Sequence, residues 1–247
     1  RLPLPPARLD TTALADRHTL EHADHVETIC LLGSQLASAL EHAHRRQIFH
    51  RDIKPANVLV NRYGRPFLAD FNLATTGIGM GQSSLIGGTL SHMAPEHLET
   101  LVTRTPLLEA DGQRLGDIYS LGVLLWQTTT GQVPFSDEQD LESEIEWHER
   151  ISRLVHRRQQ MPADQWAGSE VFQFRSSEEL GTGRPLQSES DRPMSANSTY
   201  RMLAEIIGKC MNAKSQCRYQ SARAIRRALE GLSELHTARR EPEVFGQ

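Results

Sequence analysis

Residues 50–57 read HRDIKPAN, and this polar stretch decides the fold because of the patterns on either side of it. From Val26 to about Arg46, apolar residues recur three and four positions apart, which predicts one long amphipathic helix. After the stretch, short apolar runs at 58–60 and 67–69 flank NRYGRP, whose composition is typical of a turn. The sequence therefore predicts a helix, a polar loop and a small β-hairpin, in that order.

Two further stretches give the polar loop its context. Residues 70–72 read DFN and follow the second apolar run directly, and residues 93–96 read MAPE. Together with HRDIKPAN, they resemble the D-F-G element, the A-P-E motif and the catalytic loop of protein kinases. The runs DFNLA at 70–74 and RYQSA at 218–222 are most similar to those of bacterial Ser/Thr kinases of the eukaryotic-like type. The resemblance implies a kinase-like C-terminal lobe, mainly α with a small β-hairpin.

This resemblance assigns each polar residue of the site a role in phosphoryl transfer from ATP. Asp52 would orient the attacking hydroxyl and accept its proton, and Lys54 would place a cation beside the transferring group. Asn57 and Asp70 would supply hard oxygen ligands for Mg²⁺ and, with Lys54, would bind the nucleotide. Thr89 would contact Asp52 and Lys54. A Lys two positions after the catalytic Asp resembles the Ser/Thr pattern, so the expected partner is a protein substrate with a Ser or Thr hydroxyl.

Other residues that match the family would support the site without touching the substrate. By resemblance, Glu96 would pair with Arg218 in a buried ion pair that anchors the substrate platform. Asp117 would hold the catalytic loop through its backbone. Residues 117–126 are apolar on nearly every side after this Asp, which predicts a central helix with Asp117 at its N-terminal end.

Two positions bear on regulation of the predicted kinase. Asn72 stands where the family usually has Gly, and Asn tolerates left-handed backbone better than other non-Gly residues do. Arg51, before the catalytic Asp, implies regulation by phosphorylation, because a cation there needs an anionic partner from the activation segment. The candidate acceptors are Thr75, Thr76, Ser83 and Ser84.

The resemblance also implies an N-terminal lobe with a Gly-rich loop, a strand Lys for the phosphates and a helix Glu that pairs with this Lys. The roughly 25 residues before Val26 contain no Lys and match none of these features. We therefore expect a truncated kinase domain that is inactive alone and whose parent protein transfers the phosphoryl group. The alternative is a kinase-like scaffold without catalysis, a pseudokinase.

Composition excludes several other classes of protein. The 247 residues carry a formal net charge of −4 with a pI near 6.3, so no basic field favours nucleic acid as a partner. The longest apolar run, 121–126, is far too short to form a membrane-spanning segment. Three cysteines, an odd number, argue for a reducing compartment. We expect a cytoplasmic chain, either free or as the cytoplasmic part of a longer, membrane-anchored protein.

The rest of the chain completes one domain. Apolar spacing predicts a helix from Leu141 to Val155, a polar loop or disordered insertion over 167–198, and two closing helices, the second capped by Ser221. We expect five segments: a connection at 1–25, the core with catalytic loop and activation segment at 26–135, a helix with polar insertion at 136–198, the closing helices at 199–236 and a tail at 237–247.

Several conspicuous features favour ordinary structural interpretations. The glycine-rich run at 77–81 has no strand before it, so it is expected to belong to the activation segment and not to a nucleotide loop. His42 and His44 are expected to be solvated or part of the core, and Cys210 and Cys217 lack the further ligands of a metal site. The pairs at 157–158 and 226–227 are expected to be solvated arginines on helix faces.

Overall fold

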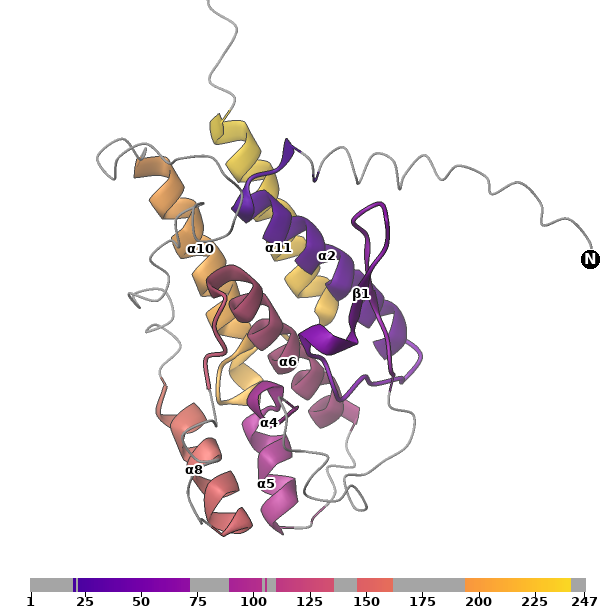
Figure 1. Cartoon of the computed structure of the whole chain (residues 1–247), viewed down its shortest axis with the longest axis vertical. Helices are drawn as coiled ribbons and strands as arrows, with labels where there is room; N and C mark the ends of the chain where they lie inside the picture. The colour runs from indigo at the N-terminus through magenta and orange to yellow at the C-terminus, as the bar shows by residue number, and fades with distance from the viewer. Residues whose placement is uncertain are drawn as a thin grey trace, which may run out of the picture.

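A computed structural model describes seven stretches of the chain, and the arrangement is mainly helical (Figure 1). The described residues are 20, 22–71, 89–103, 105, 110–135, 146–161 and 194–240. The helices within them are α2 (His25–His44), α4 (Thr89–His92), α5 (Pro95–Thr103), α6 (Ala110–Thr130), α8 (Trp147–Gln160), α10 (Met194–Cys210) and α11 (Ala222–Arg240), with short 3₁₀ turns η1 (Pro55–Asn57) and η4 (Ser215–Cys217). None of these helices is long and apolar enough to cross a membrane.

Helix α6 forms the centre of the domain, with α2 and α10 packed against it (Figure 1). Every residue from Leu115 to Trp126 is buried, as the apolar sequence predicts. The helix begins at Ala110, however, so the prediction that Asp117 lies at its N-terminal end is wrong. The first turns read ADGQR, and this polar segment lacks the apolar spacing by which a buried helix is recognised. Asp117 is consequently a fully buried carboxylate in the interior of a helix.

The predicted long helix is confirmed as α2, and its start is fixed by a capping box. The Asp24 side chain accepts a hydrogen bond from the Glu27 amide at 3.0 Å, and the Glu27 side chain accepts one from the Asp24 amide at 3.0 Å. Helix α11 packs along α2, and Gly33 permits the close approach. A Cβ at Gly33 would lie 2.9 Å from side-chain carbons of both Leu125 and Leu229.

The two closing helices are confirmed, but their bounds differ from the prediction. Helix α10 begins at Met194, so residues 194–198 are helical and not part of the expected polar insertion. Ser and Asn in this first turn are weak helix formers, which concealed the start. Helix α11 extends to Arg240, and the Ser221 hydroxyl accepts a hydrogen bond from the Ala224 amide at 3.3 Å, as a cap does. Residues 162–193 lie outside the described part of the chain, as do Leu141 and Ile145, so they do not test those predictions.

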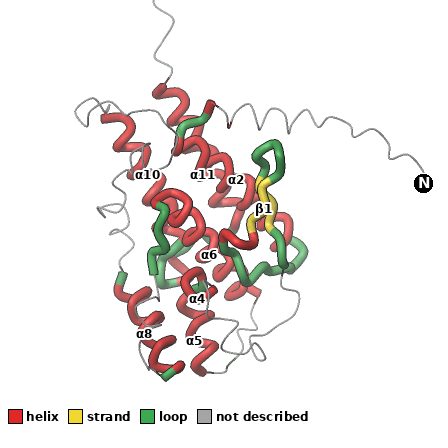
Figure 2. The backbone as a smooth tube through the Cα atoms, viewed as in Figure 1, coloured by secondary structure: helices red, strands yellow, loops and turns green. Residues whose placement is uncertain are grey.

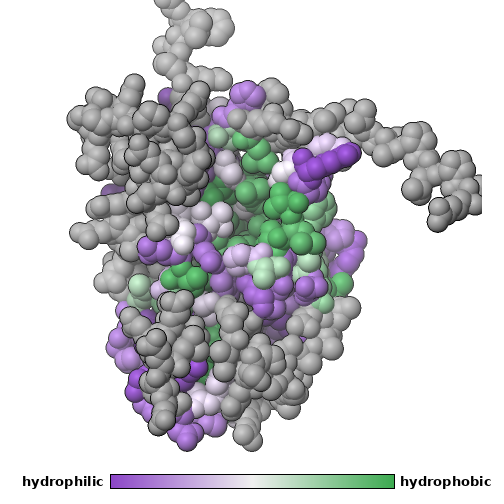
Figure 3. Space-filling view, viewed as in Figure 1, coloured by the Kyte–Doolittle hydropathy of each residue, from purple (hydrophilic) through white to green (hydrophobic). Residues whose placement is uncertain are grey.

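The hairpin is also confirmed: β1 (Val58–Val60) pairs antiparallel with β2 (Pro66–Leu68), and Figure 2 shows this two-stranded sheet beside the helices. Leu59 lies opposite Phe67, and both are largely exposed, at 59% and 48%. Val60 is exposed as well. Figure 3 shows hydrophobic residues gathered on this face of the molecule. An apolar surface of this kind marks an interaction site more often than an isolated exposed Leu does.

Contact between α6 and α10 depends on Gly122. A Cβ at this position would lie 2.6 Å from Cys210 Cβ, a distance that real side chains do not reach. We therefore expect Gly122→Val to lower the free energy of unfolding by about 1–3 kcal/mol through overpacking, as measured by urea denaturation. The matched control is Gly231→Ala, because a Cβ at Gly231 meets nothing within 4 Å. Equal stability of Gly122→Val and the wild-type chain would contradict this account of the interface.

Candidate active site

Asp117 holds the catalytic loop to the centre of the domain. Its Oδ1 accepts a hydrogen bond from the Arg51 amide at 2.7 Å, and its Oδ2 accepts one from the His50 amide at 2.8 Å. His44 Nε2 lies 2.8 Å from the same Oδ2. Because a carboxylate only accepts, this nitrogen is the donor. The role predicted for Asp117 is therefore present in the geometry, and His44 has the core role expected of it.

His50 connects the catalytic loop to the residues around Asp70. Its Nε2 lies 2.9 Å from the Ala69 carbonyl oxygen and must donate to it, since a carbonyl accepts only. Its ring lies against that of Phe71, with 4.6 Å between the centroids. The His50 side chain is completely buried. Residues 50–52 and 69–71 are thus held together by a hydrogen bond and an aromatic contact.

The Asp52 carboxylate is oriented by two donors on one of its oxygens. Lys54 Nζ and Asn57 Nδ2 both lie 2.9 Å from Oδ2. Asn57 Nδ2 also donates to the Asp52 backbone oxygen at 2.7 Å, which fixes the amide against the loop. Among the described residues, no hydrogen bond is made to the second oxygen, Oδ1. Within the described part of the chain, the carboxylate is therefore held through Oδ2, which leaves Oδ1 as an acceptor there.

Asn57 and Asp70 are brought together by the hairpin that separates them in sequence. The Asn57 backbone oxygen accepts a hydrogen bond from the amide of Ala69, the residue before Asp70, at 2.9 Å. Asn57 donates through Nδ2, so its amide oxygen Oδ1 is the atom of this side chain that could coordinate a cation. No described side chain pairs with the exposed Asp70 carboxylate. One amide oxygen and one carboxylate are the hard donors that Mg²⁺ shares with nucleotide phosphates, so the residues fit that ion.

Two residues of the site have left-handed backbone although neither is glycine. Arg51 has φ of 66° and Asp70 has φ of 57°. Such conformations cost on the order of 1–3 kcal/mol and persist where the surroundings determine them. For Arg51 the determining contact is the amide hydrogen bond to Asp117. Asn72 lies outside the described residues, so its expected tolerance of left-handed backbone stays a prediction.

Arg218 and Glu96 form the predicted ion pair. The two Nη nitrogens lie 2.6 and 2.8 Å from the two carboxylate oxygens, which is bidentate geometry. The guanidinium is buried and also donates to the backbone oxygens of Leu115, Asn212 and Ala213. Burial alone would raise the pKa of Glu96, but the hydrogen bonds and charge of Arg218 outweigh it and hold the pKa below its usual range. The pair is therefore a fully satisfied buried anchor.

The prediction for the arginines at 157–158 is wrong for Arg158, which is 1% exposed. Its Nη2 donates to the Leu90 and Ser91 backbone oxygens at 2.6 and 3.2 Å, and its guanidinium lies over the Phe135 ring. Arg158 thereby holds α4, at the end of the predicted activation segment, against α8. The sequence did contain a signal, since position 158 falls on the helical face of Ile151, four residues after Leu154 and three after Val155.

Arg226 is also more than a solvated arginine. Its Nη1 lies 2.9 Å from Glu230 and its Nε lies 3.4 Å from Glu41 of α2, so it joins α11 to α2.

Cys210 is buried, and burial raises the pKa of its thiol to about 12, which disfavours the thiolate that a metal would bind. Within the described residues, no group of three or more His, Cys, Asp or Glu side chains could hold a metal.

Several predicted residues are not tested by the geometry. Thr89 is the first residue of α4, but its side chain lies outside the described part, so its contact with Asp52 and Lys54 stays a prediction. The candidate phosphorylation sites between 75 and 84 lie outside the described residues, as does the glycine-rich run at 77–81.

The Asp117 network predicts that His44 stabilises the catalytic loop. We expect His44→Asn to speed hydrogen exchange of the His50 and Arg51 amides on the order of tenfold, because one buried hydrogen bond to their shared acceptor is lost. The matched control is His42→Asn, since His42 is exposed on the same helix. Unchanged exchange at both amides in His44→Asn would contradict the network.

The Glu96–Arg218 pair predicts a pH-dependent contribution to stability. Because folding lowers the pKa of Glu96, its contribution is present above the unfolded value of about 4.3 and disappears as the pH falls through the folded value. We expect Glu96→Gln to lower the free energy of unfolding by about 2 kcal/mol at neutral pH. Chemical denaturation between pH 7 and pH 3 should show this difference shrinking.

Glu99→Gln provides the control for that series, since Glu99 is exposed on the same helix and its carboxylate accepts a hydrogen bond from the uncharged Gln159 side chain. A difference between Glu96→Gln and the wild-type chain that is the same at acidic and neutral pH would contradict the role given to the carboxylate charge.

Comparison with known proteins identifies the family to which this chain belongs. Three relatives are similar to part of the chain: the probable serine/threonine-protein kinase pknA2 of Bifidobacterium longum, with 35% identity, PrkC of Bacillus subtilis, with 35%, and PknK of Mycobacterium tuberculosis, with 39%. The aligned segments cover 45%, 46% and 45% of this chain but only 14%, 16% and 9% of those proteins. The family model described as "Protein kinase domain" matches residues 10–229, nearly the whole chain. The chain therefore belongs to the protein kinase domain family.

Proposed function

We propose that this chain carries the catalytic loop of a kinase that transfers the γ-phosphoryl group of ATP to Ser or Thr hydroxyls of proteins. The observation that supports this most directly is the state of Asp52. One carboxylate oxygen is pinned by Lys54 and Asn57, while the other accepts nothing from the described residues. A positioned carboxylate with an open acceptor is what proton removal from an attacking alcohol requires.

In the proposed reaction, Asp52 Oδ1 accepts the hydrogen bond of the substrate hydroxyl and takes its proton as the oxygen attacks phosphorus. Lys54, 2.9 Å from the other oxygen, keeps the carboxylate oriented and offers a cation beside the transferring group. The Asn57 amide restricts the rotation of Asp52, so the reacting oxygen is presented in one direction.

Asn57 and Asp70 would hold Mg²⁺ through Oδ1 and the carboxylate. The ion supplies neutralisation of the charge on the phosphoryl oxygens. His50 supports this arrangement because it fixes Ala69 and Phe71, the neighbours of Asp70, against the catalytic loop. The left-handed backbone at Asp70 contributes to the direction in which this carboxylate leaves the chain.

The hairpin offers a surface for the apolar part of the nucleotide. Leu59 and Phe67 lie opposite each other, both exposed, and β1 begins directly after Asn57. We propose that the adenine ring rests near this pair while the phosphates reach Asn57 and Asp70. A flat aromatic base favours such an aliphatic and aromatic platform.

The choice of Ser and Thr as acceptors rests on Lys54, two positions after Asp52, and on the serine/threonine kinases that the chain resembles. Because the relatives are much longer than the matched segment, the activity proposed is that of the polypeptide containing this chain. The protein substrate would approach along α4 and α5, which Arg158 and the Glu96–Arg218 pair hold in place.

The test is phosphate transfer from radiolabelled ATP with Mg²⁺ by the longest polypeptide that contains this chain. We expect Asp52→Asn to lower the rate about 10²–10⁴-fold, because the proton acceptor is lost. The melting temperature should change little, since the amide keeps the shape of the side chain. Acid hydrolysis of the product should release phosphoserine or phosphothreonine.

Asp111→Asn is the matched control, because Asp111 is an exposed carboxylate that pairs with Arg114 on α6, and it should leave the rate unchanged. Full activity of Asp52→Asn, or phosphotyrosine as the product, would refute the proposal. No transfer by a folded wild-type protein would favour the kinase-like scaffold instead.

A further inference from the structure

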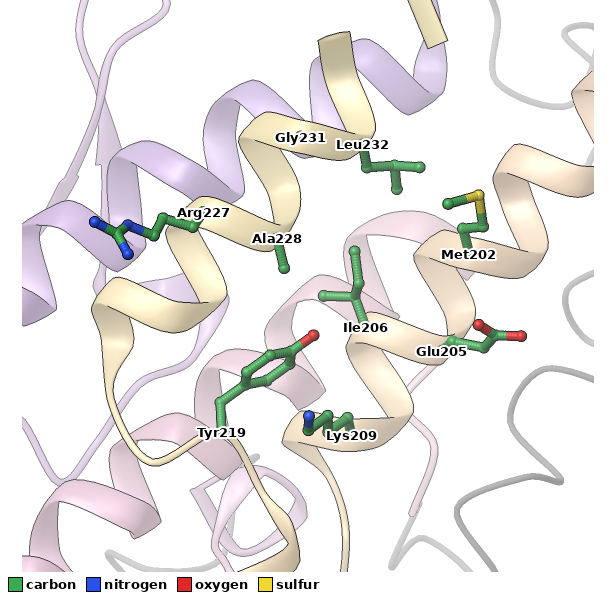
Figure 4. A pocket seen from close by; sticks show the side chains of 9 residues that line it. All are labelled: Met202, Glu205, Ile206, Lys209, Tyr219, Arg227, Ala228, Gly231 and Leu232. Carbon is green, nitrogen blue, oxygen red and sulfur yellow. The ribbon is translucent and has the colours of Figure 1, made fainter. Parts of the chain in front are cut away.

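A groove lies between α10 and α11, and no residue of the candidate active site contributes to it (Figure 4). Its volume is about 440 Å³, within the range of sites that hold small ligands or a few side chains. Its apolar lining comes from both helices and from the short connection between η4 and α11: Met202, Ile206, Tyr219, Ala228 and Leu232.

The groove is open where a side chain could enter it. A Cβ at Gly231 would meet nothing within 4 Å, and Met202 is 36% exposed although it is a large apolar residue. Figure 4 shows Tyr219 between the two helices with its hydroxyl directed toward Ile206 and Ala228. Lys209 lies over the Tyr219 ring, with 4.5 Å from Nζ to the centroid. The charged residues of the lining are Lys209, Arg227 and Glu205.

We propose that the segment EPEVFGQ, residues 241–247, folds back onto this groove and inserts Val244 and Phe245 into it. The segment follows α11 directly, lies outside the described residues, and contains two adjacent large apolar side chains. Burying an aromatic side chain in an apolar groove is favourable because it removes apolar surface from water.

The distances allow this docking. Leu232 lies eight residues before Arg240, the last residue of α11, which is about 12 Å along the helix axis. The five residues from Arg240 to Phe245 reach about 16 Å when extended. Pro242 favours the change of direction that the segment needs after the helix. Phe245 can therefore reach the end of the groove formed by Leu232 and Gly231.

The experiment places a fluorine label on Phe245 alone and records its resonance in the full chain. We expect a resonance displaced from that of the free peptide EPEVFGQ and broadened by slow tumbling. Gly231→Leu, which fills the groove, should return the resonance to the position seen in the peptide. Gly231→Ala adds only a methyl group at the same position, and it should leave the displaced resonance in place.

A second readout keeps the test independent of the label and of that variant. In the unlabelled chain, Phe245→Ala should shift the methyl resonance of Met202, whereas Gln247→Ala should not. A resonance at position 245 that equals that of the peptide in the wild-type chain, or a Met202 signal unaffected by Phe245→Ala, would refute the docking. Loss of the displaced signal on dilution would refute it too, because the occupant would then be a segment from a second copy.

Discussion

The buried carboxylate of Asp117 is the interaction on which the rest of the structure depends. It lies in the interior of α6, where an isolated charge would cost several kcal/mol, and each oxygen is satisfied by donors from other segments. The amides of His50 and Arg51 bind its two oxygens, and Arg51 itself has left-handed backbone, with φ of 66°. The cost of burying Asp117 is therefore offset by three hydrogen bonds from segments outside α6.

The same logic extends from the loop to the reacting groups. The His50 amide donates to Asp117 in α6, and the His50 ring donates to the Ala69 backbone oxygen. Because Ala69 precedes Asp70, these two bonds fix the backbone before Asp70 relative to α6. Asn57 links the same two segments a second time, because its backbone oxygen accepts from the Ala69 amide while its side chain orients Asp52. The proposed proton acceptor and the proposed metal ligand are thus parts of one hydrogen-bonded unit, and their separation is set by the hairpin.

The sequence predicted the elements whose signals are local. The spacing from Val26 onward predicted α2, and the apolar run at 117–126 predicted the central part of α6. It could not show that α6 starts at Ala110, because a polar turn becomes helical there only through the helix that follows it. The prediction for Arg158 was wrong because its charge suggests solvent. Its place on the buried face of α8 is visible in the sequence, but its partners, the backbone oxygens of Leu90 and Ser91, are not.

Helix α6 also holds residues 92–96, at the start of α5, through hydrogen bonds from both its side chains and its backbone. The Ser120 hydroxyl donates to the His92 backbone oxygen, and Gln127 contacts the His92 ring. The Leu115 oxygen accepts from Arg218, which in turn holds Glu96. One buried helix thereby fixes the catalytic loop at one point and both ends of the short stretch 92–96 at others. If the proposed protein substrate binds along α4 and α5, helix α6 is the element that connects it to the loop carrying Asp52.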